Sequence, residues 1–303
     1  MSVVAYRAGS AVAHRLPGLV VGGVAAKVAV AASRRGPGMA RRRQMVGRHL
    51  QRATGVMQTG PDLEASIDRA FASYARYWAE SLRLPGSSPA EIDAGMSWEG
   101  IGRISRAVHD GRGAILALPH LGGWEWGGFW MVLQGFAMTV VVEALEPPEL
   151  FEWFTGFRRS LGMEVVAVGP GAAMAVVRAL RAGGVVCLLC DRNVGGSGGV
   201  EVEFFGERTE LPGGPATLAM RTGAALLPSA VYFDGPGDRH LAVVRPEIVP
   251  EPLARGAGSA ATRAEVARIT QVLAGELEVL IRRTPTQWHL MQPNWPSDPG
   301  YSR

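Results

Sequence analysis

The stretch AILALPHLGGWEW, residues 114–126, decides the fold. Its first five residues, Ala114–Leu118, form a short apolar run that predicts a buried strand. Pro119 ends the run, because proline cannot donate a hydrogen bond to a strand ladder. Two glycines follow, and Trp124–Leu133 is then predicted to be a helix. A buried strand that passes directly into a helix indicates an α/β fold.

His120 lies on the connection between this strand and helix, and Glu125 lies in the first turn of the helix, where the helix dipole favours a carboxylate. The connection doubles back, so the imidazole and the carboxylate can meet. A neutral imidazole can take a proton from an attacking alcohol, while a carboxylate fixes its tautomer. Ligands also tend to bind at the carboxyl ends of strands in open α/β sheets. The pair indicates a general base, with a capping or packing role for His120 as the alternative.

The rest of the chain alternates between strand-like and helix-like patterns. Strands are expected at 114–118, 136–143, 164–168, 185–190, 200–205, 225–233 and 240–245, the last of them at a sheet edge. Helices are expected at 63–84, 98–109, 148–161, 172–182, 215–222 and from 262 onward. This alternation predicts an α/β fold with a central mixed, mostly parallel sheet of about seven strands flanked by helices.

Charge is distributed unevenly along the chain. The first 61 residues contain nine arginines, one lysine and no acid, whereas the remainder carries 21 basic and 27 acidic residues. Such asymmetry points to an anionic surface, either a membrane or nucleic acid. Nucleic acid is disfavoured, because the basic segment lacks interleaved aromatic residues and no recognition motif follows it.

An apolar segment within this basic region, Leu16–Ala32, has 17 residues and contains Lys27, which falls short of the ~20 residues of a spanning helix. We expect it to lie on, or dip into, a membrane face. Seven arginines would then meet anionic head groups: Arg34, Arg35, Arg41, Arg42, Arg43, Arg48 and Arg52. The alternative is an ordinary pair of N-terminal helices whose arginines are merely solvated.

Metal and nucleotide-cofactor sites are not expected. The sequence has no H-E-x-x-H motif, no close cluster of histidine and cysteine, and no P-loop, and Gly169-Pro170-Gly171 lacks the third glycine of a dinucleotide fingerprint. Cys187 and Cys190 form a C-x-x-C pattern, but they lie inside the apolar run 185–190 and are predicted to be core residues.

Several motifs together carry a family resemblance. The segment HLGGWE, residues 120–125, resembles the H-x-x-x-x-D/E motif of the glycerolipid acyltransferase superfamily. Further motifs follow in order: Asp191-Arg192 at a strand end, VEFFGE at 202–207, LPGGPA at 211–216, GAALLP at 223–228 and QWHLMQP at 287–293. From about Asp62 to the end, the chain resembles the lipid A late acyltransferase family, most closely its actinobacterial branch, the phosphatidylinositol mannoside acyltransferases.

This resemblance implies transfer of an acyl chain from acyl-coenzyme A to a mannose hydroxyl, by a peripheral protein on the cytoplasmic face of the cell membrane. His120 would be the general base and Glu125 its orienting partner, with acyl-coenzyme A as donor substrate and no cofactor. Four further positions match polar residues that line the family site and would hold the acceptor or the developing oxyanion, or act as supporting salt bridges: Glu143, Arg158, Asp191 and Arg192.

Two domains are therefore expected: a membrane-associating segment, residues 1–61, from its basic charge and apolar run, and an acyltransferase domain, residues 62–303, from the resemblance. The resemblance also implies a long apolar groove for the acyl chain. The sequence departs from the mannoside branch at Glu125, where that branch has Asp, and at Asp191, where it has Glu. Two alternatives therefore stay open: a related acyltransferase with another glycolipid or a lysophospholipid as acceptor, and a catalytically inactive membrane-binding protein.

Overall fold

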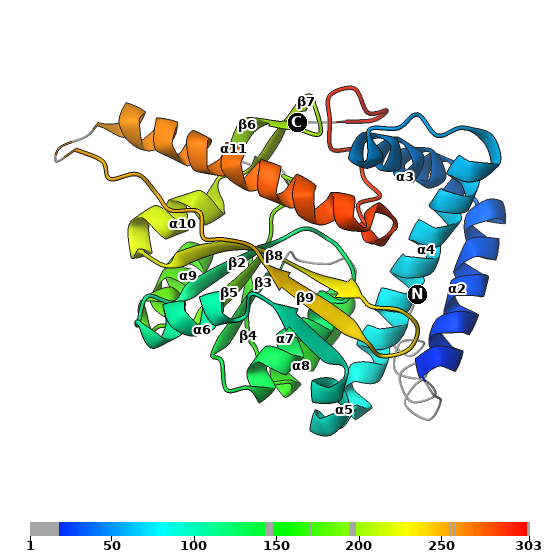
Figure 1. Ribbon diagram of the computed structural model, residues 1–303, viewed down its shortest axis with the longest axis horizontal. Helices are drawn as coiled ribbons and strands as arrows, with labels where there is room; N and C mark the ends of the chain where they lie inside the picture. Colours follow the sequence, from blue (N-terminus) through cyan, green and yellow to red (C-terminus); the bar gives the residue numbers. More distant parts are fainter. Residues whose placement is uncertain are drawn as a thin grey trace.

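The computed structural model of the 303-residue chain describes residues 18–142, 148–169, 171–193, 198–254, 256 and 258–301. Within these ranges one sheet has the strand order β1-β9-β8-β2-β5-β3-β4 and is flanked by helices (Figure 1). Neighbouring strands run parallel except β8 and β9, which are antiparallel. The predicted α/β fold with a mixed, mostly parallel sheet of seven strands is confirmed.

The sheet consists of β1 Met96–Glu99, β2 Ala114–Leu118, β3 Met138–Val142, β4 Glu164–Ala167, β5 Val185–Leu189, β8 Ala225–Phe233 and β9 His240–Val244. A separate hairpin consists of β6 Gly199–Phe204 and β7 Glu207–Pro212. The described helices are α2 Gly18–Arg35, α3 Met39–Thr54, α4 Gly60–Arg83, η1 Leu84–Gly86, α5 Pro89–Ala94, α6 Gly102–His109, α7 Trp124–Leu133, α8 Pro148–Ser160, α9 Ala172–Arg181, α10 Gly214–Thr222, α11 Ser259–Arg283 and η2 Pro285–Gln287.

Strand β2 lies in the centre of the sheet, between β8 and β5, and all of its residues are buried. A strand covered on both faces needs apolar side chains on both, which explains the unbroken AILAL run. Its carboxyl end is level with that of β5, because Leu118 pairs with Leu189. The segments that follow the two strands therefore leave the sheet side by side.

The helix predicted at 98–109 is wrong in its first part. Met96–Glu99 forms strand β1, and α6 begins only at Gly102. Between them Gly100 has a φ of 85°, and a Cβ there would collide with the backbone at the end of β9. β1 pairs with β9 and takes the sheet edge, so the expected edge position of 240–245 is also wrong. A four-residue strand is too short to display a clear two-residue period.

The strand expected at 200–205 exists but lies outside the main sheet. β6 pairs antiparallel with β7 through a two-residue turn, Phe205-Gly206, in which both residues have positive φ, as a type I′ turn requires. Phe205 is held in this unfavourable conformation because its backbone N–H donates to Glu278 of α11 at 2.5 Å and its side chain is buried. β1 takes the seventh place in the sheet, so the expected number of strands is right although one member differs.

Helices α2 and α3 precede the α/β body, and both pack against α4 (Figure 1). α3 contributes Val46 and Leu50 to a small apolar cluster with Ile67 and Phe71 of α4. On another face of α3, the buried ring of His49 lies against the C-terminal part of the chain, with Nδ1 3.0 Å from the carbonyl oxygen of Leu290. Among the described helices, none is long and apolar enough to cross a membrane.

Four of the seven arginines expected at lipid head groups pair with acids of the chain. The pairs are Arg34 with Asp68, Arg43 with Glu64 and Asp68, Arg48 with Asp298, and Arg52 with Glu207 and Asp298. Arg43 and Arg52 are the most enclosed, with 10% and 8% of their side chains exposed. Part of the basic charge of this region is therefore used in ion pairs within the protein.

The variant Gly122→Ala is expected to destabilise the fold more than the matched control Gly135→Ala. Both glycines have positive φ, 64° and 86°, so each alanine costs about 1 kcal/mol in backbone strain. A Cβ at Gly122 would also overlap the carbonyl oxygen of Val231, whereas a Cβ at Gly135 meets nothing within 4 Å. We expect urea unfolding to give an additional loss of about 2 kcal/mol for Gly122→Ala. Equal free energies of unfolding would contradict the close approach of the two backbones.

Candidate active site

His120 and Asp191 lie side by side at the carboxyl ends of β2 and β5. Asp191 Oδ1 lies 2.6 Å from His120 Nδ1, and Oδ2 accepts the backbone N–H of His120 at 3.0 Å. Asp191 is fully buried, while 23% of the His120 side chain is exposed. With Nδ1 donating to the carboxylate, Nε2 is the ring nitrogen that can take up a proton.

Asp191 stays ionised although it is buried. Burial by itself raises the pKa of its carboxyl group, but the charge of His120 and hydrogen bonds from His120 and Trp288 outweigh burial and hold the pKa below its usual value. Trp288 Nε1 donates to Oδ2 at 2.7 Å, and Asn294 Nδ2 donates to the backbone carbonyl of Asp191 at 3.0 Å. An ionised carboxylate in this position orients an imidazole and stabilises the imidazolium.

Glu125 and Arg158 form a second buried pair. Arg158 Nη2 contacts Glu125 Oε1, and Arg158 Nε lies 3.2 Å from both carboxylate oxygens. Tyr77 donates its hydroxyl to the same carboxylate at 3.3 Å. Burial by itself lowers the pKa of Arg158, but the Glu125 carboxylate raises it above its usual value. The guanidinium therefore stays charged in surroundings that are otherwise apolar.

Within the described part of the chain, His120 and Glu125 do not form the expected hydrogen bond with each other. Asp191 occupies the position at the imidazole that was expected for Glu125, and Glu125 binds Arg158 instead. Glu125 does lie in the first turn of its helix, as predicted. Arg192 follows Asp191 directly and is half-buried. Glu143 lies outside the described residues.

Three residues of the site had no role assigned from the sequence: Tyr77, Trp288 and Asn294. Tyr77 comes from α4, and its ring stacks on Trp124 with 4.2 Å between centroids. Trp288 and Asn294 come from the last part of the chain, far from His120 in sequence. The motif QWHLMQP, which includes Trp288, is the signal that could have pointed to this segment.

A second histidine, His289, lies close to the His120 loop but differs from it in character. It is buried, and its Nε2 lies 2.9 Å from Ser73 Oγ. Burial, and then the charge of His120, lower the pKa of His289 to about 3. His289 is therefore uncharged at neutral pH, and its pKa is too low for efficient proton uptake near pH 7.

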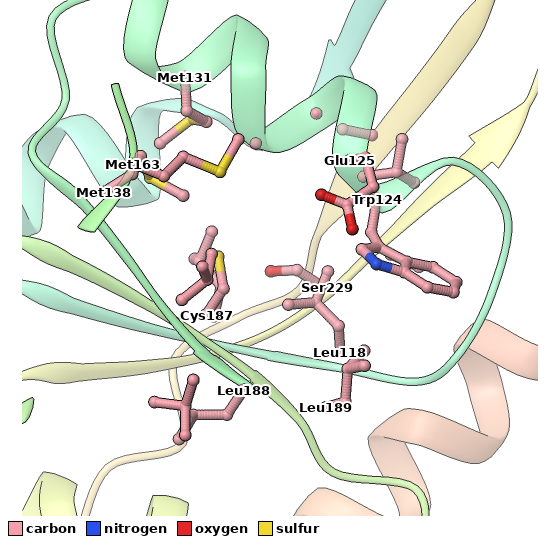
Figure 2. Close-up of a pocket in the computed structure, with 18 of the residues that line it drawn as sticks. Leu118, Trp124, Glu125, Met131, Met138, Met163, Cys187, Leu188, Leu189 and Ser229 are labelled. Carbon is pink, nitrogen blue, oxygen red and sulfur yellow. The ribbon is translucent and has the colours of Figure 1, made fainter. Parts of the chain in front are cut away.

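An apolar cavity lies between α7 and the sheet (Figure 2). Figure 2 shows Met131, Met138 and Met163 gathered at one end, with Trp124 and Glu125 at the other. The remaining lining comes mainly from aliphatic side chains of β2, β3, β5, β8 and β9. The ring of Trp124, which lines the cavity, lies 6.1 Å from the ring of His120 between centroids.

The arrangement combines a base with room for an apolar chain. His120 can remove a proton from a hydroxyl group, and the cavity offers apolar surface to a hydrocarbon chain next to the Glu125–Arg158 pair. Within the described ranges, no group of three or more His, Cys, Asp or Glu side chains could hold a metal ion. Chemistry of acyl transfer to an alcohol fits this set of residues.

Comparison with known proteins identifies relatives over most of the chain. A phosphatidylinositol mannoside acyltransferase of Mycolicibacterium smegmatis is 35% identical over 298 residues, which cover 97% of this chain and 91% of that protein. A protein of the same name from Mycobacterium tuberculosis (strain CDC 1551 / Oshkosh) is 36% identical over 268 residues, which cover 86% of this chain and 79% of that protein. The sequence model of the bacterial lipid A biosynthesis acyltransferase family matches residues 3–297 of this chain. The chain therefore belongs to the bacterial lipid A biosynthesis acyltransferase family.

Proposed function

We propose that this protein transfers a fatty acyl chain from acyl-coenzyme A to a mannose hydroxyl of a phosphatidylinositol mannoside. The observation that carries the proposal is the hydrogen-bonded pair of His120 and buried Asp191 beside an apolar cavity. Membership of the family supports the acyltransferase class. The names of the mycobacterial relatives support the mannoside as acceptor.

In the proposed mechanism, His120 Nε2 removes the proton of the mannose hydroxyl as its oxygen attacks the thioester carbonyl. Asp191 holds the ring through Nδ1 and stabilises the imidazolium that forms. The tetrahedral intermediate then expels the thiolate of coenzyme A, and the imidazolium returns the proton to that sulfur. The ester is formed, the free thiol is released and His120 is again neutral.

Glu125 assists the reaction through Arg158 in this proposal. The carboxylate binds the guanidinium at the cavity wall, and a fixed positive charge there can stabilise the oxyanion or orient the acceptor. Arg192, which follows Asp191, and Glu143 remain proposed contacts for the acceptor.

The apolar cavity is the proposed site of the acyl chain. Its lining is mainly aliphatic, aromatic and sulfur-containing, and Glu125 and Arg158 are the charged members among its described lining residues. An acyl chain placed there would leave its thioester end near Trp124 and the His120 loop. The three methionines at the far end suit a hydrocarbon chain, because thioether side chains adapt their shape readily.

The proposal is tested by measuring coenzyme A release from palmitoyl-coenzyme A, with lipid products identified by mass spectrometry. Monomannosylated and dimannosylated phosphatidylinositol and lysophosphatidic acid are offered in parallel. We expect acylated mannoside from the wild type and a kcat lower by about 10²- to 10⁴-fold for His120→Ala, because the general base is lost.

Each other result would change the conclusion in a defined way. Turnover of lysophosphatidic acid alone would keep the chemistry and overturn the mannoside acceptor. No turnover of any acceptor would favour an inactive membrane-binding protein. Full activity of His120→Ala would overturn the assignment of His120 as the general base.

Filling the cavity is expected to shorten the preferred acyl chain. Gly128 lines the cavity, and a Cβ there would lie 3.0 Å from Met163 Cε. We expect Gly128→Val to lower the ratio of kcat/KM for palmitoyl- over decanoyl-coenzyme A about tenfold, the effect of displacing one or two methylenes. The control is Gly275→Val on α11, since a Cβ at Gly275 meets nothing within 4 Å. An unchanged ratio in Gly128→Val would place the acyl chain elsewhere.

We also propose that the protein binds the cytoplasmic face of the membrane through α2. Val20, Val24 and Val28 are exposed and spaced four apart, so they form one apolar stripe along this helix. Lys27 and Arg35 lie on the same side by helical spacing and are exposed. An apolar stripe with cations beside it is typical of a helix that lies in the interface of an anionic membrane.

Replacing the three valines by serine is expected to weaken binding to vesicles that contain phosphatidylglycerol by about tenfold or more, because apolar area is lost from the interface. Binding of the wild type should also fall as salt rises. The control replaces Val272 and Val279, which are exposed on α11, by serine. Equal vesicle binding by the triple variant and the wild type would refute the role of α2.

A further inference from the structure

The C-terminal strap, residues 287–298, runs across the loop that carries His120. The carbonyl of Gln287 accepts the N–H of Gly122 at 3.0 Å, and the N–H of His289 donates to the carbonyl of His120 at 2.7 Å. Leu121 and Trp288 form an antiparallel bridge between these bonds. The strap therefore pairs with the catalytic loop as a short strand would.

Two side chains of the strap hold Asp191. The three donors to the Asp191 carboxylate come from the His120 ring, the His120 backbone and the Trp288 indole. Because the indole binds Oδ2, the carboxylate cannot rotate away from the imidazole without breaking a buried hydrogen bond. Asn294 fixes the backbone of Asp191 in the same way. Trp288 and Asn294 are each only 4% exposed, so water does not readily replace these donors.

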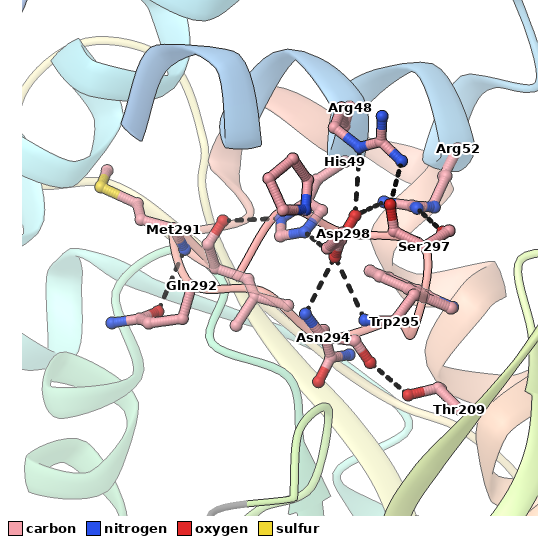
Figure 3. A network of polar contacts seen from close by, with 12 residues as sticks. Arg48, His49, Arg52, Thr209, Met291, Gln292, Asn294, Trp295, Ser297 and Asp298 are labelled. Carbon is pink, nitrogen blue, oxygen red and sulfur yellow. Dashed lines mark hydrogen bonds and ion pairs between the residues drawn. The ribbon is translucent and has the colours of Figure 1, made fainter. Parts of the chain in front are cut away.

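The strap is in turn fixed to α3 through Asp298 (Figure 3). One oxygen of this buried carboxylate accepts the backbone N–H groups of Asn294 and Trp295 at 2.9 and 3.1 Å. The other lies 3.1 Å from Arg48 Nε and 2.8 Å from Arg52 Nη1. Burial raises the pKa of Asp298, but hydrogen bonds from His49 and the backbone outweigh burial, and the pKa lies well below its usual value.

We propose that Trp288 and Asn294 are positioning residues for the His120–Asp191 pair, and that Asp298 keeps them in place by joining the strap to α3. This inference rests on the proposed function, since it assigns the strap a part in the same proton transfer. The buried N–H of Trp288 sets the rotation of the Asp191 carboxylate, and the carboxylate sets the orientation of the imidazole. The strap thereby acts on the base without touching the substrate.

The variant Trp288→Phe tests the proposal, because it keeps an aromatic ring and removes the N–H donor. We expect kcat to fall about 10- to 100-fold, the loss typical when a residue that hydrogen-bonds to a functional side chain is removed. The KM for acyl-coenzyme A should stay within twofold of the wild type. Asp191 loses a donor that favours its charged form, so its pKa rises. The pair accepts the substrate proton only in its unprotonated form, and the lost donor leaves more negative charge at the imidazole, so the acidic limb of the pH–kcat profile should move to higher pH.

The matched control is Trp126→Phe on α7. Trp126 is also buried, and its indole donates to the carbonyl of Ile92 at 3.2 Å, away from Asp191. This variant should lose a similar amount of thermal stability and keep the wild-type pH profile. If Trp288→Phe does not fold, Asn294→Ala takes its place, with a smaller fall in kcat expected and the acidic limb moved in the same direction. An unmoved limb, or a loss confined to KM, would overturn the positioning role.

A measurement without substrate separates this inference from the proposed function. The proton of the His120 Nδ1–H bond to Asp191 is followed by NMR in the full-length protein, with His120→Ala to assign it. We expect Trp288→Phe to shift or broaden this resonance and Trp126→Phe to leave it unchanged. That result without turnover of any acceptor would support the positioning and overturn the proposed function. An unchanged resonance in Trp288→Phe would overturn the positioning, whatever the activity.

Discussion

The hydrogen bond between His120 Nδ1 and the Asp191 carboxylate is the interaction on which the rest of the site depends. The Asp191 carboxylate carries a negative charge in a buried position, and such a charge is stable only when hydrogen-bond donors surround it. The adjacent strands β2 and β5 bring the two residues together, and Trp288 completes the set of donors. The fold supplies the proximity, while the last residues of the chain supply the third donor.

The site contains two buried carboxylates with different partners. Asp191 faces an imidazole, whereas Glu125 faces the guanidinium of Arg158. In each case a positive or proton-sharing partner compensates the cost of burial. The two carboxylates are therefore suited to different tasks: one orients a base, and the other keeps a permanent positive charge at the wall of an apolar cavity.

The basic N-terminal region stabilises the fold, because some of its arginines form ion pairs with acids elsewhere in the chain. Arg48 and Arg52 of α3 bind Asp298 at the end of the strap, and the ring of Trp295 lies 4.3 Å from the Arg52 guanidinium carbon. Helix α2, in contrast, leaves Val20, Val24 and Val28 exposed. Through α3 and the strap, the helices that precede the α/β body are joined by buried polar contacts to Asp191.

The sequence by itself determined the α/β class, the burial of strand β2 and the location of His120 at a strand end, because an unbroken apolar run and a following proline are local signals. It also marked Asp191 at the end of a later apolar strand. It could not determine that Asp191, and not Glu125, holds the imidazole. Strand order places β5 beside β2, so Asp191 lies next to His120. Glu125 instead binds Arg158 at the wall of the cavity. Contacts between residues far apart in sequence, such as Trp288 with Asp191, leave no local period, so only the tertiary structure decided them.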